Sequence, residues 1–126
     1  MIFKDGKDAF LFDSPMTDSL TMELVKFIKD SMLLNVVGFV PNHWHSDCMG
    51  GISVIKEHGI KTFANQMTIE TAKAKGLIPP DEGFNDSIAI NLNNKEIHLI
   101  TWVPDTVLII LWYGFLQKRC YFPVAW

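Results

Sequence analysis

The chain has 126 residues, of which 48% are hydrophobic, and carries a net charge of −3 at pH 7. This length accommodates one domain or part of one, and the hydrophobic content is typical of a globular protein. The negative charge and the lack of a basic stripe in the sequence argue against a nucleic-acid-binding or membrane-surface protein.

Neither export nor membrane insertion is expected from the sequence. The first twelve residues, MIFKDGKDAFLF, have lysines and aspartates among their apolar residues, unlike a signal peptide. The longest apolar run, residues 107–116, is about half as long as a helix that crosses a bilayer. Two cysteines, Cys48 and Cys120, do not make a disulfide framework. We therefore expect the chain to remain in the cytoplasm.

Strand and helix patterns alternate along residues 1–101. A helix is expected to begin at Thr17 or Asp18, because both are good N-cap residues and apolar residues follow at helical spacing. The other predicted elements are strands at 9–14, 35–41 and 61–65, helices at 51–59 and 66–76, a loop at 78–83, and a hairpin at 87–101 that turns at Asn93 and Asn94. Strands that alternate with helices are typical of an α/β fold.

Residues 102–126 differ sharply in composition from the preceding part. They contain only three of the chain's 11 basic and 14 acidic residues, yet they hold three of its four tryptophans and both tyrosines. We therefore divide the chain into a first unit, residues 1–101, and an apolar tail, residues 102–126.

The most informative motif is NHWHSDCMGG, residues 42–51. His43, His45 and Asp47 follow the predicted strand at 35–41, at the carboxyl end where α/β folds place their sites. If the extended conformation continues, all three side chains point the same way. Two imidazoles and a carboxylate suit zinc and, less specifically, iron or manganese. The two glycines at the end of the motif would let the chain turn tightly into the next helix.

Four other residues have two interpretations each. Cys48 is a soft ligand or reactive thiol, or simply a small buried apolar group. His58 stands at a predicted helix C-terminus, where a cation is favourable, and a structural role is expected. His98 lies on a predicted strand and is expected to be packed or exposed. Asp13 ends a strand, either as a turn residue or as an acceptor that orients a ligand histidine.

Residues 40–92 carry a family resemblance. The motifs His-Trp-His-x-Asp-Cys-x-Gly-Gly, Ala-Asn-Gln-Met-Thr-Ile and Gly-Phe-x-Asp-Ser resemble those of the metallo-β-lactamases, in particular those of Bacteroides-type bacteria. The similarity extends over about residues 1–100, and FDSP at 12–15 matches the strand-ending aspartate motif of that family.

The resemblance implies a four-layer αββα sandwich with two zinc ions between its halves, of which this chain is roughly one half. It implies that His43 and His45 bind the first zinc and that Asp47 binds the second and is catalytic, holding the zinc-bound hydroxide that attacks the lactam. Asp13 would not bind zinc itself but would orient one of the zinc ligands as a hydrogen-bond acceptor. The implied activity is β-lactam hydrolysis, hence antibiotic resistance, by a periplasmic or secreted parent protein.

After Ile100 the resemblance ends. The family continues with Tyr-Leu-Gly-x-Gly-His, a cysteine ligand and a final histidine, and this chain contains none of them. Residues 101–126 can be back-translated into DNA with synonymous codons. When one T is placed before one such DNA sequence and its bases are read again in threes, the translation is YLGTGHGTDNIVVWLPTEKMLFSGCM. This translation resembles the missing segment. We therefore predict a frameshift, the loss of one base near codon 101, and expect a truncated family segment with weak zinc binding and no β-lactam turnover.

Two alternatives stay open. One is another hydrolase of the same fold, such as a thioesterase, against which Cys48 and the Asn-Gln-Met-Thr-Ile segment argue. The other is a non-catalytic metal-binding or interaction domain in which residues 102–126 are in frame and pack on a partner.

Overall fold

The computed structural model describes the backbone of residues 1–103, 106–113 and 116–119 and the side chains of residues 1–101. Its elements are β1 (Ile2–Asp5), β2 (Asp8–Phe12), α1 (Asp18–Lys26), the π-helical turn η1 (Phe27–Ser31), β3 (Asn35–Val40), α2 (Ser46–Met49), α3 (Ile52–Glu57), β4 (Lys61–Asn65), α4 (Gln66–Ala74), β5 (Glu82–Phe84), β6 (Ser87–Leu92), β7 (Lys95–Val103), β8 (Thr106–Tyr113) and β9 (Leu116–Arg119). In this described part of the chain, no helix is both long and apolar enough to cross a membrane.

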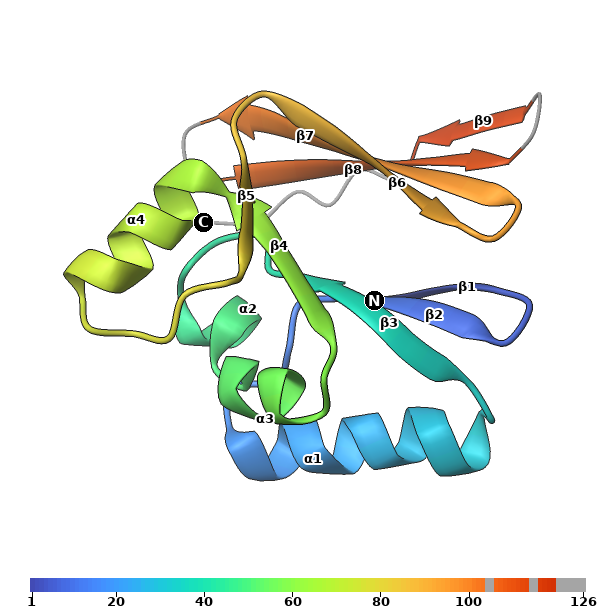
Figure 1. Ribbon diagram of the computed structural model, residues 1–126, viewed down its shortest axis with the longest axis horizontal. Coiled ribbons are helices and arrows are strands. Elements are labelled where there is room, and N and C mark those ends of the chain that lie inside the picture. Colours follow the sequence, from blue (N-terminus) through green and yellow to red (C-terminus); the bar gives the residue numbers. More distant parts are fainter. Residues whose placement is uncertain (104–105, 114–115, 120–126) are drawn as a thin grey trace.

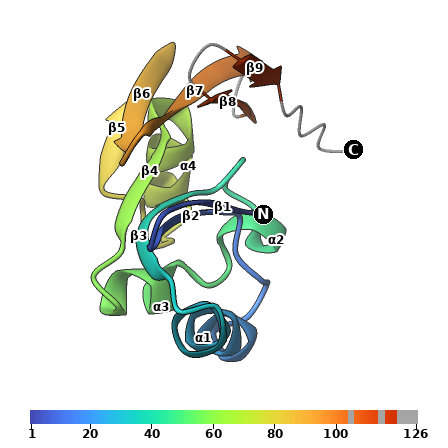
Figure 2. The ribbon, with the colours of Figure 1, turned by 90° about the vertical axis from the view of Figure 1, so that its right-hand side faces the viewer.

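The strands form two stacked sheets. The first sheet has the order β1-β2-β3-β4-β5, in which β1 is antiparallel to β2 and the other neighbours are parallel. The second is the antiparallel sheet β6-β7-β8-β9. Figure 1 shows α1 and α3 on one side of the first sheet and the second sheet on its other side. Seen from the side, the three layers follow one another from helices to sheet to sheet (Figure 2).

Each of the two faces of the first sheet is covered by its own apolar core. Between the sheets, five phenylalanines and Val40 of the first sheet pack together with Leu92, Ile97 and Leu99 of the second. Between the first sheet and the helices, Val25 and Ile28 pack with residues of α3 such as Ile52 and Ile55. The parallel strands are therefore buried on both sides, as is usual in α/β proteins.

Most predicted elements are present. Thr17 caps α1, with its hydroxyl accepting a hydrogen bond from the backbone N–H of Leu20 at 3.3 Å. The hairpin at 87–101 turns at Asn93, whose φ of 54° lies in the left-handed region that asparagine tolerates. The side chain of Asn93 also donates to the carbonyl of Asp5 at 2.8 Å, so this turn rests against the β1–β2 turn.

Within residues 1–101, three elements were not predicted, and β8 and β9 lie in the segment for which no element was predicted. Strand β1 contains charged residues and turns back through Gly6, at a φ of 60°, to pair with β2. Strand β5 occupies part of the predicted loop at 78–83 and adds an edge to the first sheet. Helix α2 begins at Ser46, inside the segment expected to continue as extended chain, and this changes the geometry of the candidate site.

The predicted boundary at residue 101 falls within β7, which continues to Val103 and pairs with β8. The side chains of the predicted apolar tail, residues 102–126, lie outside the described residues. The origin of this tail therefore stays a prediction.

Candidate metal centre

The histidine-containing loop connects β3 to α2. β3 ends at Val40, residues 41–45 bend, and Asp47 lies in the first turn of α2. The extended conformation, on which a common direction of the His43, His45 and Asp47 side chains depended, therefore does not continue through Asp47. His43 is buried, whereas His45 and Asp47 are exposed.

The helical turn nevertheless brings His43 and Asp47 together. The Nε2 atom of His43 lies 3.3 Å from Oδ1 of Asp47, and its Nδ1 atom lies 3.4 Å from Sγ of Cys48. One donor atom from each of these three residues lies within 4.8 Å of the other two, and this three-residue set is called the donor group below.

His45 lies beside the donor group but not in it. Its ring is 4.7 Å from the ring of His43 in an edge-to-face arrangement and 4.0 Å from the ring of Trp44. His45 is also the residue that precedes α2, and its side chain makes no capping hydrogen bond to this helix. Its imidazole is thus exposed and adjacent to His43.

Asp13 attaches the histidine-containing loop to the end of β2. Its Oδ1 atom accepts a hydrogen bond from the backbone N–H of Asn42 at 2.6 Å. Burial raises the pKa of Asp13, and the hydrogen bonds from Asn42 and Cys48 oppose that rise. Asp13 is thus tied to Asn42, the residue before His43, and its role as an acceptor that orients a ligand histidine stays a prediction.

The Cys48 thiol is not an activated nucleophile. Burial raises its pKa to about 12, and the nearby carboxylates of Asp13 and Asp47 add to this rise. Because the thiolate is the reactive form, a buried thiol with a raised pKa is inert at neutral pH. The interpretation of Cys48 as a reactive thiol is therefore not supported.

Ser14 was missed as a site residue, although it is part of the FDSP motif. Its hydroxyl accepts a hydrogen bond from the backbone N–H of Gly51 at 3.0 Å, and its own N–H donates to the carbonyl of Cys48 at 2.8 Å. Asp13 and Ser14 together fasten both ends of the loop and α2 to the end of β2.

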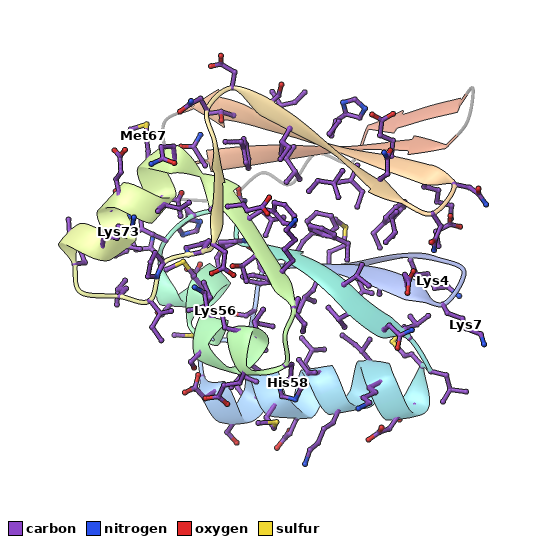
Figure 3. The ribbon with its side chains drawn as sticks, viewed as in Figure 1. Lys4, Lys7, Lys56, His58, Met67 and Lys73 are labelled. Atoms are coloured by element: carbon purple, nitrogen blue, oxygen red, sulfur yellow. The ribbon has the colours of Figure 1, made fainter. Side chains whose placement is uncertain are left out.

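The two remaining histidines lie outside the donor group. Nδ1 of His58 lies 2.9 Å from the carbonyl oxygen of Val54 at the end of α3, and Figure 3 shows its ring next to α1. His98, on β7, lies 3.2 Å from the carboxylate of Glu96. Neither belongs to the group that could hold a metal, in agreement with the structural roles expected for them.

An open pocket of about 530 Å³ lies next to His45. It is lined mainly by apolar side chains, among them Met16, Trp44, Met49 and Leu77. His43, Asp47 and Cys48 are not in its lining, so this pocket is not the centre of the donor group.

The spacing within the donor group fits a metal ion. Two donors bound to one tetrahedral zinc at about 2.0–2.3 Å lie about 3.3–3.8 Å apart. The separations of 3.3 and 3.4 Å from His43 to Asp47 and Cys48 are in this range, although each involves a different ring nitrogen, so a single ion would use one of them. Asp47 is exposed, which leaves the group open to solvent.

Comparison with known proteins identifies relatives of this chain. No family model matches it. It is 37% identical over 116 residues to the metallo-β-lactamase type 2 of Bacteroides fragilis, covering 82% of this chain and 47% of that protein. It is 25% identical to the metallo-β-lactamase type 2 of Bacillus cereus, covering 83% of this chain and 46% of that protein.

Solved structures give the same fold. A metallo-β-lactamase from Pontibacter korlensis superposes with a TM-score of 0.81 at 24% identity, covering 87% of this chain and 53% of that one. A metallo-β-lactamase from Hirschia baltica gives 0.71 at 26% identity, covering 86% and 52%. The predicted fold, about half of a metallo-β-lactamase sandwich, is therefore confirmed.

The chain spans about half the length of the curated relatives it matches. Its similarity to the Bacteroides protein extends over most of its residues, as the HWHSDC motif predicted. The chain is accordingly a homologue, of about half length, of the type 2 metallo-β-lactamases.

Proposed function

We propose that this chain is the part of a zinc-dependent β-lactamase that carries its first metal ligands. His43 and His45 would bind one zinc ion, and Asp47 would bind a second. The observation that supports this proposal most is the approach of His43 Nε2 to Asp47 Oδ1 at 3.3 Å on the loop that follows β3. Zinc, when bound, lowers the pKa of a water molecule and polarises a carbonyl group.

The chain's own residues would position the reactants. His43 is held in the interior by Cys48, so its ring orientation is fixed before a metal arrives. Asp47 is exposed and can accept a hydrogen bond from a water molecule next to the lactam carbonyl. Asp47 is for this reason the residue to which we assign the catalytic role.

The ligand set is incomplete for catalysis. A catalytic zinc generally has three protein ligands and one open position. Among residues 1–101, whose side chains the structure describes, the donor group is the sole such cluster, and neither His58 nor His98 joins it. We therefore expect weak zinc binding and no turnover of a β-lactam by the 126-residue chain.

We further propose that residues 102–126 arise from the loss of one base near codon 101. Reading permitted codons in a frame shifted by one base restores a Gly-Thr-Gly-His segment and a later cysteine. The change in amino-acid composition after residue 101 supports the same position for the lost base. Sequencing of the DNA through this codon tests the proposal directly. Codons that cannot be regrouped into the family segment would refute it.

A comparison of two proteins tests the proposed function. One is the 126-residue chain, and the other replaces residues 101–126 by the regrouped segment. We expect the second protein to bind zinc at least about 10-fold more tightly, because a ligand is restored. Equilibrium dialysis measures the affinities, with His58→Gln as the control in both proteins. Equal affinities, or hydrolysis of a chromogenic cephalosporin by the 126-residue chain, would contradict the proposal.

One observation favours a second candidate function. The donor group by itself has three potential ligands, so one ion could bind without any later part of a β-lactamase. This chain would then be a non-catalytic metal-binding domain. Zinc binding at one ion per chain that the regrouped segment does not strengthen would favour this function over the first. The thioesterase alternative gains no support, since the relatives described above are metallo-β-lactamases.

A further inference from the structure

Helix α2, which carries Asp47, is too short to hold its own position. It consists of Ser46–Met49, and the side chain of His45, the residue before it, makes no capping hydrogen bond. The backbone N–H groups of Met49 and Gly50 donate to carbonyl oxygens one turn earlier, at 2.9 Å each. Isolated helices shorter than about 12–15 residues are marginal in water. The direction in which Asp47 points therefore depends on what holds α2 from outside.

Ser14, two residues after β2, holds the end of α2 through both its backbone and its side chain. Its backbone N–H donates to the carbonyl oxygen of Cys48 at 2.8 Å. Its hydroxyl accepts a hydrogen bond from the backbone N–H of Gly51 at 3.0 Å. The one hydrogen of this hydroxyl can be donated to the carbonyl oxygen of Cys48, at 3.3 Å, or of Pro15, at 3.2 Å. Ser14 is 4% exposed, so water does not compete freely for these bonds.

The chain after Ser14 lies so close to the turn between α2 and α3 that only glycine fits in that turn. A Cβ atom at Gly50 would overlap the carbonyl oxygen of Met16, and one at Gly51 would overlap the side chain of Thr21. Both views of the ribbon show the connection from β2 to α1 next to α2 (Figures 1 and 2). The Ser14 hydroxyl therefore bonds across a contact that is already closely packed.

We propose that Ser14 is a positioning residue, whose hydroxyl fixes α2 against the end of β2 so that the carboxylate of Asp47 faces His43. Oδ1 of Asp47 lies 3.3 Å from Nε2 of His43. Asp13 fixes the other end of the loop through its hydrogen bond from Asn42 at 2.6 Å, so two consecutive residues hold the chain just before His43 and just after Asp47. Ligands must be held within about 0.5 Å of their working geometry. The inference rests on the proposed role of His43 and Asp47 as metal ligands.

Amide hydrogen exchange of the metal-free 126-residue chain tests whether the hydroxyl holds α2. Ser14→Ala removes the hydroxyl and keeps the backbone N–H. We expect the N–H groups of Met49 and Gly50, as well as that of Gly51, to exchange at least about 5-fold faster, because α2 opens once the bond to Gly51 is lost. Ser14→Thr keeps the hydroxyl and should restore slow exchange. Faster exchange confined to Gly51 would overturn the proposal.

Thr62→Val is the matched control for the loss of a buried hydroxyl. The Thr62 side chain is fully buried on β4 and, like that of Ser14, accepts from a backbone N–H far along the chain, that of Asp81 at 2.8 Å. We expect Thr62→Val to leave exchange in α2 unchanged. Equal acceleration in Thr62→Val and Ser14→Ala would show a general loss of stability and overturn the proposal.

The geometry of the bound metal is the second readout. The chain is saturated with cobalt, so that differences in affinity do not enter the visible spectrum. We expect the ligand-field bands of Ser14→Ala to shift toward those of Asp47→Ala and its zinc affinity to fall about 10-fold. The bands of Ser14→Thr and Thr62→Val should match those of the unsubstituted chain.

Identical bands at saturation in Ser14→Ala and the unsubstituted chain would overturn the proposal. If the unsubstituted chain binds neither cobalt nor zinc, the proposed function fails. The exchange measurement, which needs no metal, then decides by itself whether Ser14 holds α2.

Discussion

The carboxylate of Asp13 accepts a hydrogen bond of 2.6 Å from the backbone N–H of Asn42, which joins the end of β2 to the start of the histidine-containing loop. The two residues meet because β2 and β3 are parallel neighbours, with Phe12 paired to Val40. Asp13 has a φ of 60° and a half-buried side chain, whose burial raises the pKa of its carboxyl group. Both features are unfavourable for an aspartate, and features of this kind cluster at functional sites.

Replacement of Asp13 by asparagine tests whether the carboxylate serves stability or the metal. Burial raises the pKa of Asp13 in the folded chain. The proton it retains contributes stability below its unfolded pKa of about 3.9, and this contribution is lost as pH rises through the folded pKa. We therefore expect the unfolding free energy of the unsubstituted chain, relative to Asp13→Asn, to fall as pH rises from about 3.5 to 7.

Urea unfolding at several pH values measures this difference. Asp30→Asn, at an exposed position, serves as the control and should show no such trend. We also expect Asp13→Asn to weaken zinc binding about 10-fold, because the histidine-containing loop loses the charged acceptor of the Asn42 N–H. A relative stability that rises with pH would contradict this account of Asp13.

Gly51 is required by the close approach of α1. A Cβ atom at this position would lie 1.9 Å from Oγ1 of Thr21, closer than any real contact. We expect Gly51→Ala to destabilise the chain by about 1–3 kcal/mol, the usual cost of overpacking. Thr21→Ala removes two of the three obstructing atoms, Oγ1 and Cγ2, and keeps Cβ at 2.5 Å. The double variant should therefore recover part of this loss in a double-mutant cycle of urea unfolding.

The two single variants and the double variant are compared at the same pH. Purely additive losses in the cycle would show that the contact with Thr21 is not the cause. Gly50 and Gly51 form the predicted tight turn between α2 and α3. Their φ values of −60° and −100° are open to other residues, so close packing is what requires glycine there.

Asn65 joins the first sheet to the second. Its Oδ1 atom accepts from the backbone N–H of Met67 at 2.8 Å and caps α4, while its Nδ2 donates to the carbonyl of Asn85 at 3.0 Å and to the hydroxyl of Thr101. Asn65→Asp keeps the cap but cannot donate. We expect Asn65→Asp to cost about 1–3 kcal/mol, because it places a buried carboxylate opposite the carbonyl of Asn85, which then keeps only the hydrogen bond from the Thr101 hydroxyl. We expect Asn65→Ala to cost about 1 kcal/mol more through the lost cap.

Thermal or urea unfolding gives these two losses. Gln66→Ala, which removes an exposed hydrogen bond to Glu70, is a matched control and should change the unfolding free energy by less than about 0.5 kcal/mol. Equal stability of Asn65→Asp and the unsubstituted chain would show that the bonds between the sheets contribute nothing.

Much of the fold was predictable because local signals agree with the final structure. Thr17 begins α1, and Asn93 turns the 87–101 hairpin. β1 was missed because Lys4 and Asp5 obscure its alternation, although charged residues are common in an edge strand. β5 was missed because three residues are too few for a pattern.

The members of the site were predictable, but their arrangement was not. A strand pattern was extended through Ser46 and Asp47, although serine and aspartate favour helix starts. The resulting turn of helix brings Asp47 back to His43 and places Cys48 against His43. Contacts to Asp13 depend on the pairing of β2 with β3, which no local pattern contains.

The most direct test of the central claim, that the loop after β3 binds a divalent metal through His43, is the visible absorption of the 126-residue chain titrated with cobalt. We predict that ligand-field bands appear and saturate, that they are lost in His43→Gln, and that they are unchanged in His58→Gln. A titration without such bands, or identical bands in His43→Gln and the unsubstituted chain, would contradict the claim.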